Sequence, residues 1–303
     1  MSKSRTLTPF LWFDSEAEEA AEFYVSAFGD GQVGSLTHYT AESAGMAGRP
    51  EGSVMTAGFE VAGQGFVALN GGPLFSFTPA LSFFVNCSGE EEARALFDRL
   101  SEGGTALMPF DRYPFSPAYG WVADRFGVTW QINSVPRADK LAPCLLFVGN
   151  QCGRAEEAMN LYMSLFPQSR LESIDRYAAG EGPDAEGTVR HAVFSLGGQE
   201  VRIMDSAHDH RFTFTEAISL QVLCDTQAGI DRLWDGLAEG GDPEAQRCGW
   251  LKDRFGVSWQ IVPRVLSTML GDADRGKASR VTDAFLQMKK FDIATLERAF
   301  EGR

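Results

Sequence analysis

Short apolar runs alternate along the chain with amphipathic stretches and glycine-rich turns. The runs at 7–13 and 141–148 predict strands. Each run is followed by apolar residues at helical spacing, which predict a helix. These residues are Ala20, Phe23, Tyr24, Ala27 and Phe28 after the first run, and Ala158, Leu161, Tyr162, Leu165 and Phe166 after the second.

The later segments predict more strands and helices in the same order. Glycine-containing turns at 62–64 and 197–199 suit hairpins between neighbouring strands. The strands expected here are 53–62, 65–70, 81–87, 188–197, 200–205 and 218–224, and the helices are 89–102 and 226–239. Two last strands surround an Asp-Arg-Phe-Gly turn in each half. The pattern predicts an α+β fold with mostly antiparallel pairing.

An internal repeat explains why this order occurs twice. Trp121–Ile132 and Trp250–Ile261 are identical at nine of twelve positions, and other segments match in the same order. We therefore predict domain 1 over 1–137, domain 2 over 138–264, and a helical C-terminal tail over 265–303. Apolar stripes in the tail predict two or three helices that pack on the second domain or on a partner.

Composition and charge narrow the function classes. The 303-residue chain has a net charge of −14, which disfavours binding to nucleic acid or to anionic membrane surfaces. No apolar run is long enough to span a bilayer, and no signal peptide is evident at the N-terminus. Five cysteines without a CxxC pair suit reduced thiols. We expect a cytoplasmic protein.

Three motifs resemble one superfamily. Cys248–Pro263, His210–Ser219 and Leu286–Leu296 are similar to segments of the PhnB-like branch of the vicinal oxygen chelate superfamily, which includes glyoxalase I and the bleomycin-resistance proteins. That branch carries the label 3-demethylubiquinone-9 3-methyltransferase. The resemblance covers nearly the whole chain. It implies tandem glyoxalase-like domains, each of paired βαβββ modules with a curved sheet around a concave pocket.

The sequence offers little support for the cofactors that such relatives bind. Metal-dependent members place His, Gln or Glu on the first, fourth, fifth and eighth strands of a site. Here the first strands offer no ligand, the fourth end in Asn70 and Asp205, the fifth offer Ser82, Ser219 and Gln221, and the eighth offer Gln131 and Gln260. We expect no native divalent metal. Methyl transfer is not expected either, because no Gly-rich turn follows an apolar strand to open a helix.

Several polar and aromatic residues are candidates for a ligand pocket. We predict His191 as a general base on a strand face, with Asp205 able to orient it, as catalytic residues. The predicted ligand-binding residues are Trp121, Gln131, His210, Cys248, Trp250 and Gln260. Structural alternatives stay open: a hydrogen-bonded half-buried His191, a His210 that caps the next turn, and tryptophans in an ordinary core. The repeated Asp-Arg-Phe-Gly turns favour a structural role.

Two functions remain open at this stage. The first is a small-molecule-binding protein without chemistry, for which an acidic pocket would favour a cationic ligand. The alternative is a metal-dependent lyase, isomerase or dioxygenase acting from the pocket of the second domain. Whether the protein is an enzyme stays undecided, and cofactors other than a metal are unknown. A small-molecule ligand is the expected partner, and the protein is expected to be a monomer or a homodimer.

Overall fold

The computed structural model describes residues 6–303, which form four βα modules followed by a helical tail. The first repeat supplies two modules. Module one contains β1 (Leu7–Phe13), α1 (Ala17–Phe28), β2 (Gln32–His38), α2 (Ala41–Ala47), β3 (Val54–Val61) and β4 (Gln64–Asn70). Module two contains β5 (Leu81–Asn86), α3 (Glu90–Ser101), β6 (Thr105–Tyr113), β7 (Ser116–Ala123) and β8 (Thr129–Asn133).

The second repeat supplies the other two modules. Module three contains β9 (Leu141–Phe147), the 3₁₀ turn η1 (Gly149–Gln151), α4 (Ala155–Leu165), β10 (Arg170–Arg176), β11 (Val189–Leu196) and β12 (Gln199–Asp205). Module four contains β13 (Ile218–Cys224), α5 (Gln227–Ala238), β14 (Asp242–Arg247), β15 (Trp250–Lys252) and β16 (Ser258–Pro263). The tail contains α6 (Val265–Leu270), α7 (Arg275–Leu286) and α8 (Ile293–Glu301).

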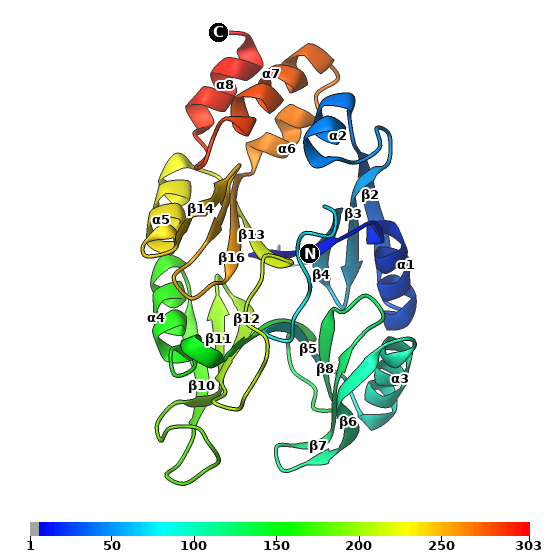
Figure 1. Ribbon diagram of the computed structural model, residues 1–303, viewed down its shortest axis with the longest axis vertical. Coiled ribbons are helices and arrows are strands. Elements are labelled where there is room, and N and C mark those ends of the chain that lie inside the picture. The colour runs from blue at the N-terminus through cyan, green and yellow to red at the C-terminus, as the bar shows by residue number, and fades with distance from the viewer. Residues whose placement is uncertain (1–5) are drawn as a thin grey trace.

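The strands form two eight-stranded sheets, each with one module from each repeat (Figure 1). Sheet A has the strand order β14-β15-β16-β13-β1-β4-β3-β2 and joins modules one and four. Sheet B has the order β10-β11-β12-β9-β5-β8-β7-β6 and joins modules two and three. The α+β class and the duplication are therefore confirmed.

The modules pair across the repeats, whereas the resemblance led us to expect a sheet within each repeat. β1 pairs antiparallel with β13, with Phe10 opposite Ser219, and β5 pairs antiparallel with β9, with Ser82 opposite Cys144. Each of these four strands lies at the edge of its own module. Pairing two such edges gives hydrogen-bond partners to backbone N–H and C=O groups that would otherwise lack them. A module from either repeat can supply these partners. The pattern of one strand therefore does not select its partner.

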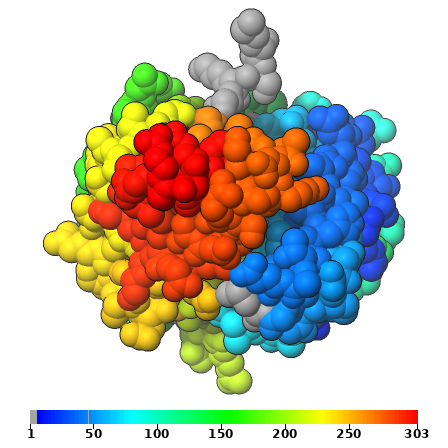
Figure 2. Space-filling model, turned by 90° about the horizontal axis from the view of Figure 1, so that it is seen from above, coloured from blue at the N-terminus to red at the C-terminus, as the bar shows by residue number. Residues whose placement is uncertain are grey.

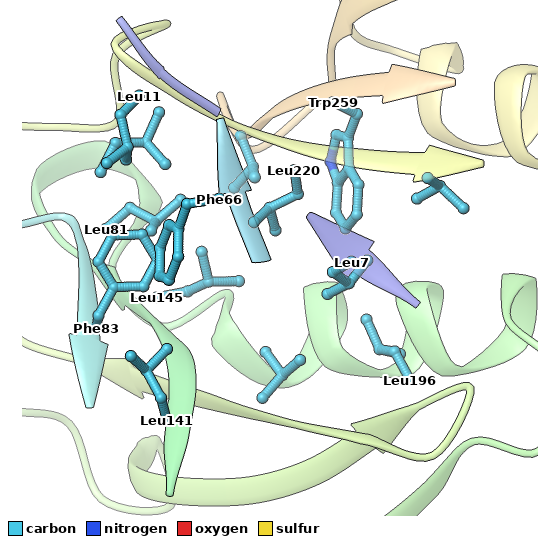
Figure 3. Close-up of a cluster of buried hydrophobic side chains, with 14 of the residues drawn as sticks. Leu7, Leu11, Phe66, Leu81, Phe83, Leu141, Leu145, Leu196, Leu220 and Trp259 are labelled. Atoms are coloured by element: carbon cyan, nitrogen blue, oxygen red, sulfur yellow. The ribbon is translucent and has the colours of Figure 1, made fainter. Parts of the chain in front are cut away.

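The main hydrophobic core lies on the helix-covered faces of both sheets, and a small second cluster around Phe84, Tyr119 and Cys144 lies on the other face of sheet B. The main core includes Leu7 and Leu220 from sheet A together with Phe83 and Leu145 from sheet B (Figure 3). Helices α1 and α3 lie on one side of the molecule, and α4 and α5 lie on the other (Figure 1). Because strand side chains alternate, the remaining residues of each strand point to the opposite face, here called the non-core face.

The repeated Asp-Arg-Phe-Gly turn has the structural role that its repetition favours. In the second repeat, Asp253 is 3% exposed and accepts four hydrogen bonds. Its donors are Tyr162 Oη, Trp259 Nε1 and the backbone N–H groups of Phe255 and Val257. Asp124 has the same four kinds of donor in the first repeat. Gly256 supplies a positive φ of 94°, which a turn glycine adopts at little cost.

The tail packs on the second repeat, which is one of the two arrangements expected from the sequence. The hairpin between β14 and β15 donates to the tail through Cys248 N to Met288 O and Gly249 N to Lys289 O, both at 2.8 Å. Figure 2 shows the tail beside the segment that contains α2, at one end of the molecule. Over residues 6–303, none of the helices has the length and apolarity needed to cross a membrane.

Candidate functional site

The non-core faces of the two sheets hold five of the predicted site residues. Trp121, Gln131 and His191 lie on sheet B, whereas Trp250 and Gln260 lie on sheet A. The strand registers show this, because they place each of these residues on the face away from the core residues of the same strand. The structure thus divides the predicted residues between two faces. Each face combines residues from both repeats.

A Ser–Gln–Trp set occurs on both non-core faces at matching positions. On sheet B, Gln131 Nε2 donates to Ser82 Oγ at 2.8 Å, and Trp121 lies opposite Gln131. On sheet A, Gln260 Nε2 donates to Ser219 Oγ at 2.9 Å, and Trp250 lies opposite Gln260. Trp121 and Trp250 are half-buried, while Trp130 and Trp259 are fully buried in the core. The repeat therefore places one pair of tryptophans in the core and one pair on the non-core faces.

Sheet B adds a buried ion pair to this set. Arg202 Nη2 lies 2.9 Å from Glu200 Oε1, and the two side chains are only 4% and 6% exposed. The guanidinium also donates to Asn86 Oδ1 at 3.0 Å and lies 3.6 Å from the ring centre of Phe84. These contacts fix the position of the guanidinium on the non-core face of sheet B.

Within the part of the chain that the structure describes, two buried polar atoms on the non-core face of sheet B lack a hydrogen-bond partner. They are Trp121 Nε1 and Ser195 Oγ. Ser195 lies opposite Glu200, on the same face as His191. A buried donor without a partner costs free energy, which a ligand acceptor would recover. This face is therefore suited to a ligand that accepts hydrogen bonds.

His191 lies on this face in an environment that keeps the imidazole neutral. Burial, together with the charges of Arg202 and Arg137, lowers the pKa of His191 to about 4. Its ring centre is 6.4 Å from that of Phe84. At neutral pH the side chain can donate or accept a hydrogen bond, but a group with this pKa is a weak base.

The low pKa of His191 predicts a loss of stability in acid. Its folded-state pKa of about 4 is below the ordinary value of 6.5, so its contribution is complete above pH 6.5 and is lost as the pH falls towards 4. This difference corresponds to about 3 kcal/mol. In urea titrations at several pH values, His191→Gln should lose less stability than the parent between pH 6.5 and 4. His38→Gln, on the exposed strand β2, is the control, and equal pH profiles for parent and His191→Gln would contradict the assignment.

Sheet A has an aromatic cluster and lacks the ion pair of sheet B. Phe10 and Trp12 of β1 lie on its non-core face, and both rings contact Trp250. Val67, opposite Phe10, takes the place that Arg202, opposite Cys144, has in sheet B. Near the end of β1 a cavity of about 330 Å³ is lined by Trp12 and Phe75, among other residues. The two faces therefore differ in the ligands that they suit.

Three predicted residues lie away from the two faces. Asp205 accepts hydrogen bonds from the backbone N–H groups of residues 153, 155 and 189, and so holds the start of α4 on the core side. It is not brought together with His191. His210 shares a hydrogen bond with Ser206 Oγ at 2.9 Å in the loop after β12, so its partner precedes it and does not belong to the following turn. The thiol of Cys248 faces the tail, 3.9 Å from Leu286 O.

The positions that hold a metal in metal-dependent relatives do not offer a suitable donor set here. On sheet B, the central strands place Ser82, Gln131, Cys144 and Arg202 on the non-core face. On sheet A, they place Phe10, Val67, Ser219 and Gln260 there. A guanidinium repels a divalent ion, and Phe and Val cannot bind one. Within residues 6–303, no three His, Cys, Asp or Glu side chains are grouped to hold a metal.

The sequence reasoning missed several residues of these faces. Glu200, Arg202, Phe84, Phe10 and Trp12 were not proposed as site residues. The signal for the ion pair was present, because two charges interrupt the apolar strand Gln199–Asp205. A charge in a buried strand needs a partner, and this indicates a polar site.

Comparison with protein families gives a match over both repeats. The family model described as 3-demethylubiquinone-9 3-methyltransferase matches residues 5–133 and 139–262. A PhnB protein from Bacillus cereus is 39% identical, over 43% of this chain and 98% of that chain, with a TM-score of 0.39. A protein from Pseudomonas aeruginosa is 25% identical, over 44% and 98% of the two chains, with a TM-score of 0.37.

A further match spans both repeats. Glyoxalase I from Zea mays is 10% identical, over 86% of this chain and 92% of that chain, with a TM-score of 0.54. This likeness shows a common fold. A search of curated proteins found no match.

Proposed function

Because the chain belongs to the 3-demethylubiquinone-9 3-methyltransferase family and has a glyoxalase-like fold, we propose that it binds small molecules on the non-core faces of its two sheets. The observation that carries this proposal is the Ser–Gln–Trp set. It occurs on both faces, with a half-buried tryptophan beside a hydrogen-bonded glutamine. Aromatic rings with a few fixed polar groups are typical of small-molecule sites.

Methyl transfer is not part of the proposal, despite the family's description. A usual methyl-donor site needs a Gly-rich turn that leads from a parallel strand into a helix. Here Gly29 ends α1, and Gly63 lies in the hairpin between β3 and β4. Neither position opens a helix. The metal-dependent alternative has no support from the donor sets described above.

The proposal includes a location and an assembly state. The five cysteines are unpaired thiols, which suits the reducing cytoplasm. Each sheet joins its two modules within one chain, so a monomer can form both non-core faces. A homodimer is also compatible with this topology. A small molecule is the proposed partner, without nucleic acid or membrane.

A thermal-shift screen with a broad metabolite panel tests the proposal. Compounds that raise the melting temperature of the parent should bind about tenfold more weakly to one of two variants, Trp121→Leu or Trp250→Leu, because each removes one aromatic wall. Leu171→Ala, at an exposed position of β10, is the control. A panel without any stabilising compound would contradict the proposal. Stoichiometric metal in gently purified protein would instead favour the lyase, isomerase or dioxygenase alternative.

A further inference from the structure

Three half-buried rings meet on the non-core face of sheet A. The ring centres of Phe10 and Trp12 lie 6.3 and 6.4 Å from that of Trp250, and both ring planes stand at 83° to it. Two of the rings come from the first repeat and one from the second. We call Phe10, Trp12 and Trp250 the aromatic trio. Rings at right angles can direct their faces to a common centre, as in sites that bind methylated ammonium groups.

The position of Trp12 in this trio is fixed by neighbouring backbone. Trp12 Nε1 donates to Gly72 O at 2.8 Å. A Cβ at Gly71 would lie only 2.1 Å from the Trp12 ring, so glycine is required there. Phe75 also packs against Trp12, with the two ring centres 5.0 Å apart. The ring is thus held before any ligand arrives, which lowers the entropic cost of binding.

Elsewhere in the protein, Arg side chains of the chain itself lie over the faces of aromatic rings. Arg202 lies over Phe84 at 3.6 Å on the other sheet, and Arg125 and Arg154 lie over core-side phenylalanines. Among the described residues, no Lys or Arg lies over a ring of the aromatic trio. Val67 stands where the matching strand of sheet B has Arg202. The aromatic trio of sheet A therefore has no cation of the chain over its rings, whereas Arg202 covers Phe84 on sheet B.

Most of the charged side chains around the trio form ion pairs. Lys252, two residues from Trp250, is neutralised by Glu216 at 2.7 Å. The cavity that Trp12 lines also has Asp14, Glu16 and Arg125 in its wall. The chain as a whole carries a net charge of −14. Asp14 pairs with Arg49 at 3.1 Å, and Arg247 lies opposite Trp250. The overall charge of the chain, and not the local charge, therefore favours a positive ligand.

We infer that the aromatic trio of sheet A binds a methylated ammonium group of a small-molecule ligand. This names the ligand class of one face and rests on the proposed function. The ring faces supply the attraction, and the apolar walls of Val67 and Leu69 suit the methyl groups. On sheet B, Arg202 already covers the face of Phe84 at 3.6 Å and would compete with the same group, so the two faces take different ligands.

Choline and 3,3-dimethylbutan-1-ol test the inference, because they share a shape and differ in charge. In calorimetric titrations of the parent, choline should bind at least about fivefold more tightly than the alcohol. Trp250→Leu should remove most of this preference. Phe115→Leu, a ring exposed on the hairpin between β6 and β7, should keep it. The comparison of the two probes on the parent does not depend on how any variant folds.

The outcomes separate this inference from the proposed function. A preference for choline that Trp250→Leu removes supports the inference. Equal binding of choline and the alcohol overturns it and leaves an apolar ligand site. Binding of neither probe, while other compounds of the metabolite panel bind, also overturns it and leaves the proposed function intact. Binding of no compound at all overturns both.

Discussion

Asp253→Asn should lower the free energy of unfolding by about 3–4 kcal/mol, one of the two largest losses that we expect. The side chain is 3% exposed, and its Oδ2 accepts from Tyr162 Oη at 2.6 Å and Trp259 Nε1 at 2.9 Å. An amide in this position turns one acceptor into a donor that faces two other donors. Chemical denaturation followed by circular dichroism measures the loss.

The repeat and the surface supply two comparisons for this variant. Asp124→Asn should produce a similar loss, because its donors are Tyr24 Oη and Trp130 Nε1 at 2.9 and 2.8 Å. Asp225→Asn removes an exposed partner of Arg264 and should change stability by less than about 1 kcal/mol. If Asp253→Asn cost as little as Asp225→Asn, the buried hydrogen bonds from Tyr162 of α4 and from Trp259 would not stabilise the fold as predicted.

Arg202→Val should lower the free energy of unfolding by about 3 kcal/mol. The substitution leaves Glu200 buried at 6% exposure, with Arg137 as its remaining cationic partner at 3.0 Å. It also leaves Asn86 Oδ1 without the guanidinium donor. Removing one member of a buried ion pair costs more than removing both, because the other charge stays desolvated. Urea denaturation of the parent and the variant measures this cost.

The double variant Glu200→Gln/Arg202→Val distinguishes the charge effect from packing. It should recover at least half of the loss, because no isolated charge remains and Val67 already occupies the matching position of sheet A. Arg176→Val breaks an exposed pair with Glu156 and should cost less than about 1 kcal/mol. A double variant no more stable than Arg202→Val would show that packing, and not the unpaired charge, causes the loss.

The sequence predicted the buried elements well because each has one apolar face. The helices α1 and α4 and the strands β3, β4, β11 and β12 follow the expected segments closely. The strands β2, β6, β10 and β14 were not predicted. They are the four edge strands of the two sheets and are exposed along most of their length, so none has a clear alternating apolar pattern. Exposed edges give no periodic signal in one sequence.

The pairing of modules across the repeats could not be predicted from the patterns. Phe10 meets Ser219, and Cys144 meets Ser82, although these residues come from different halves of the chain. Backbone hydrogen bonds at the edge of a module are the same for any partner strand. Which partner is chosen depends on the connections and on side-chain packing between distant segments, and neither is visible locally.

The same limit explains the mixed success with site residues. Alternation correctly placed His191 on a face with Val193 and Ser195. It could not show that Asp205, one strand away, points to the core side and holds α4. The contact of Phe10 and Trp12 with Trp250 depends on the cross-repeat pairing of sheet A. Knowledge of the topology was therefore needed to find the aromatic trio.

The central claim is that small molecules bind on the non-core faces, and fluorine NMR of protein labelled with 5-fluorotryptophan tests it most directly. The six tryptophans divide between the two environments. Three lie on the non-core faces, and three are buried in the core: Trp12, Trp121 and Trp250 in the first group, and Trp130, Trp234 and Trp259 in the second. Compounds that stabilise the protein should shift resonances of the first group and leave those of the second unchanged. Shifts confined to the core tryptophans, or no shift with any stabilising compound, would contradict the claim.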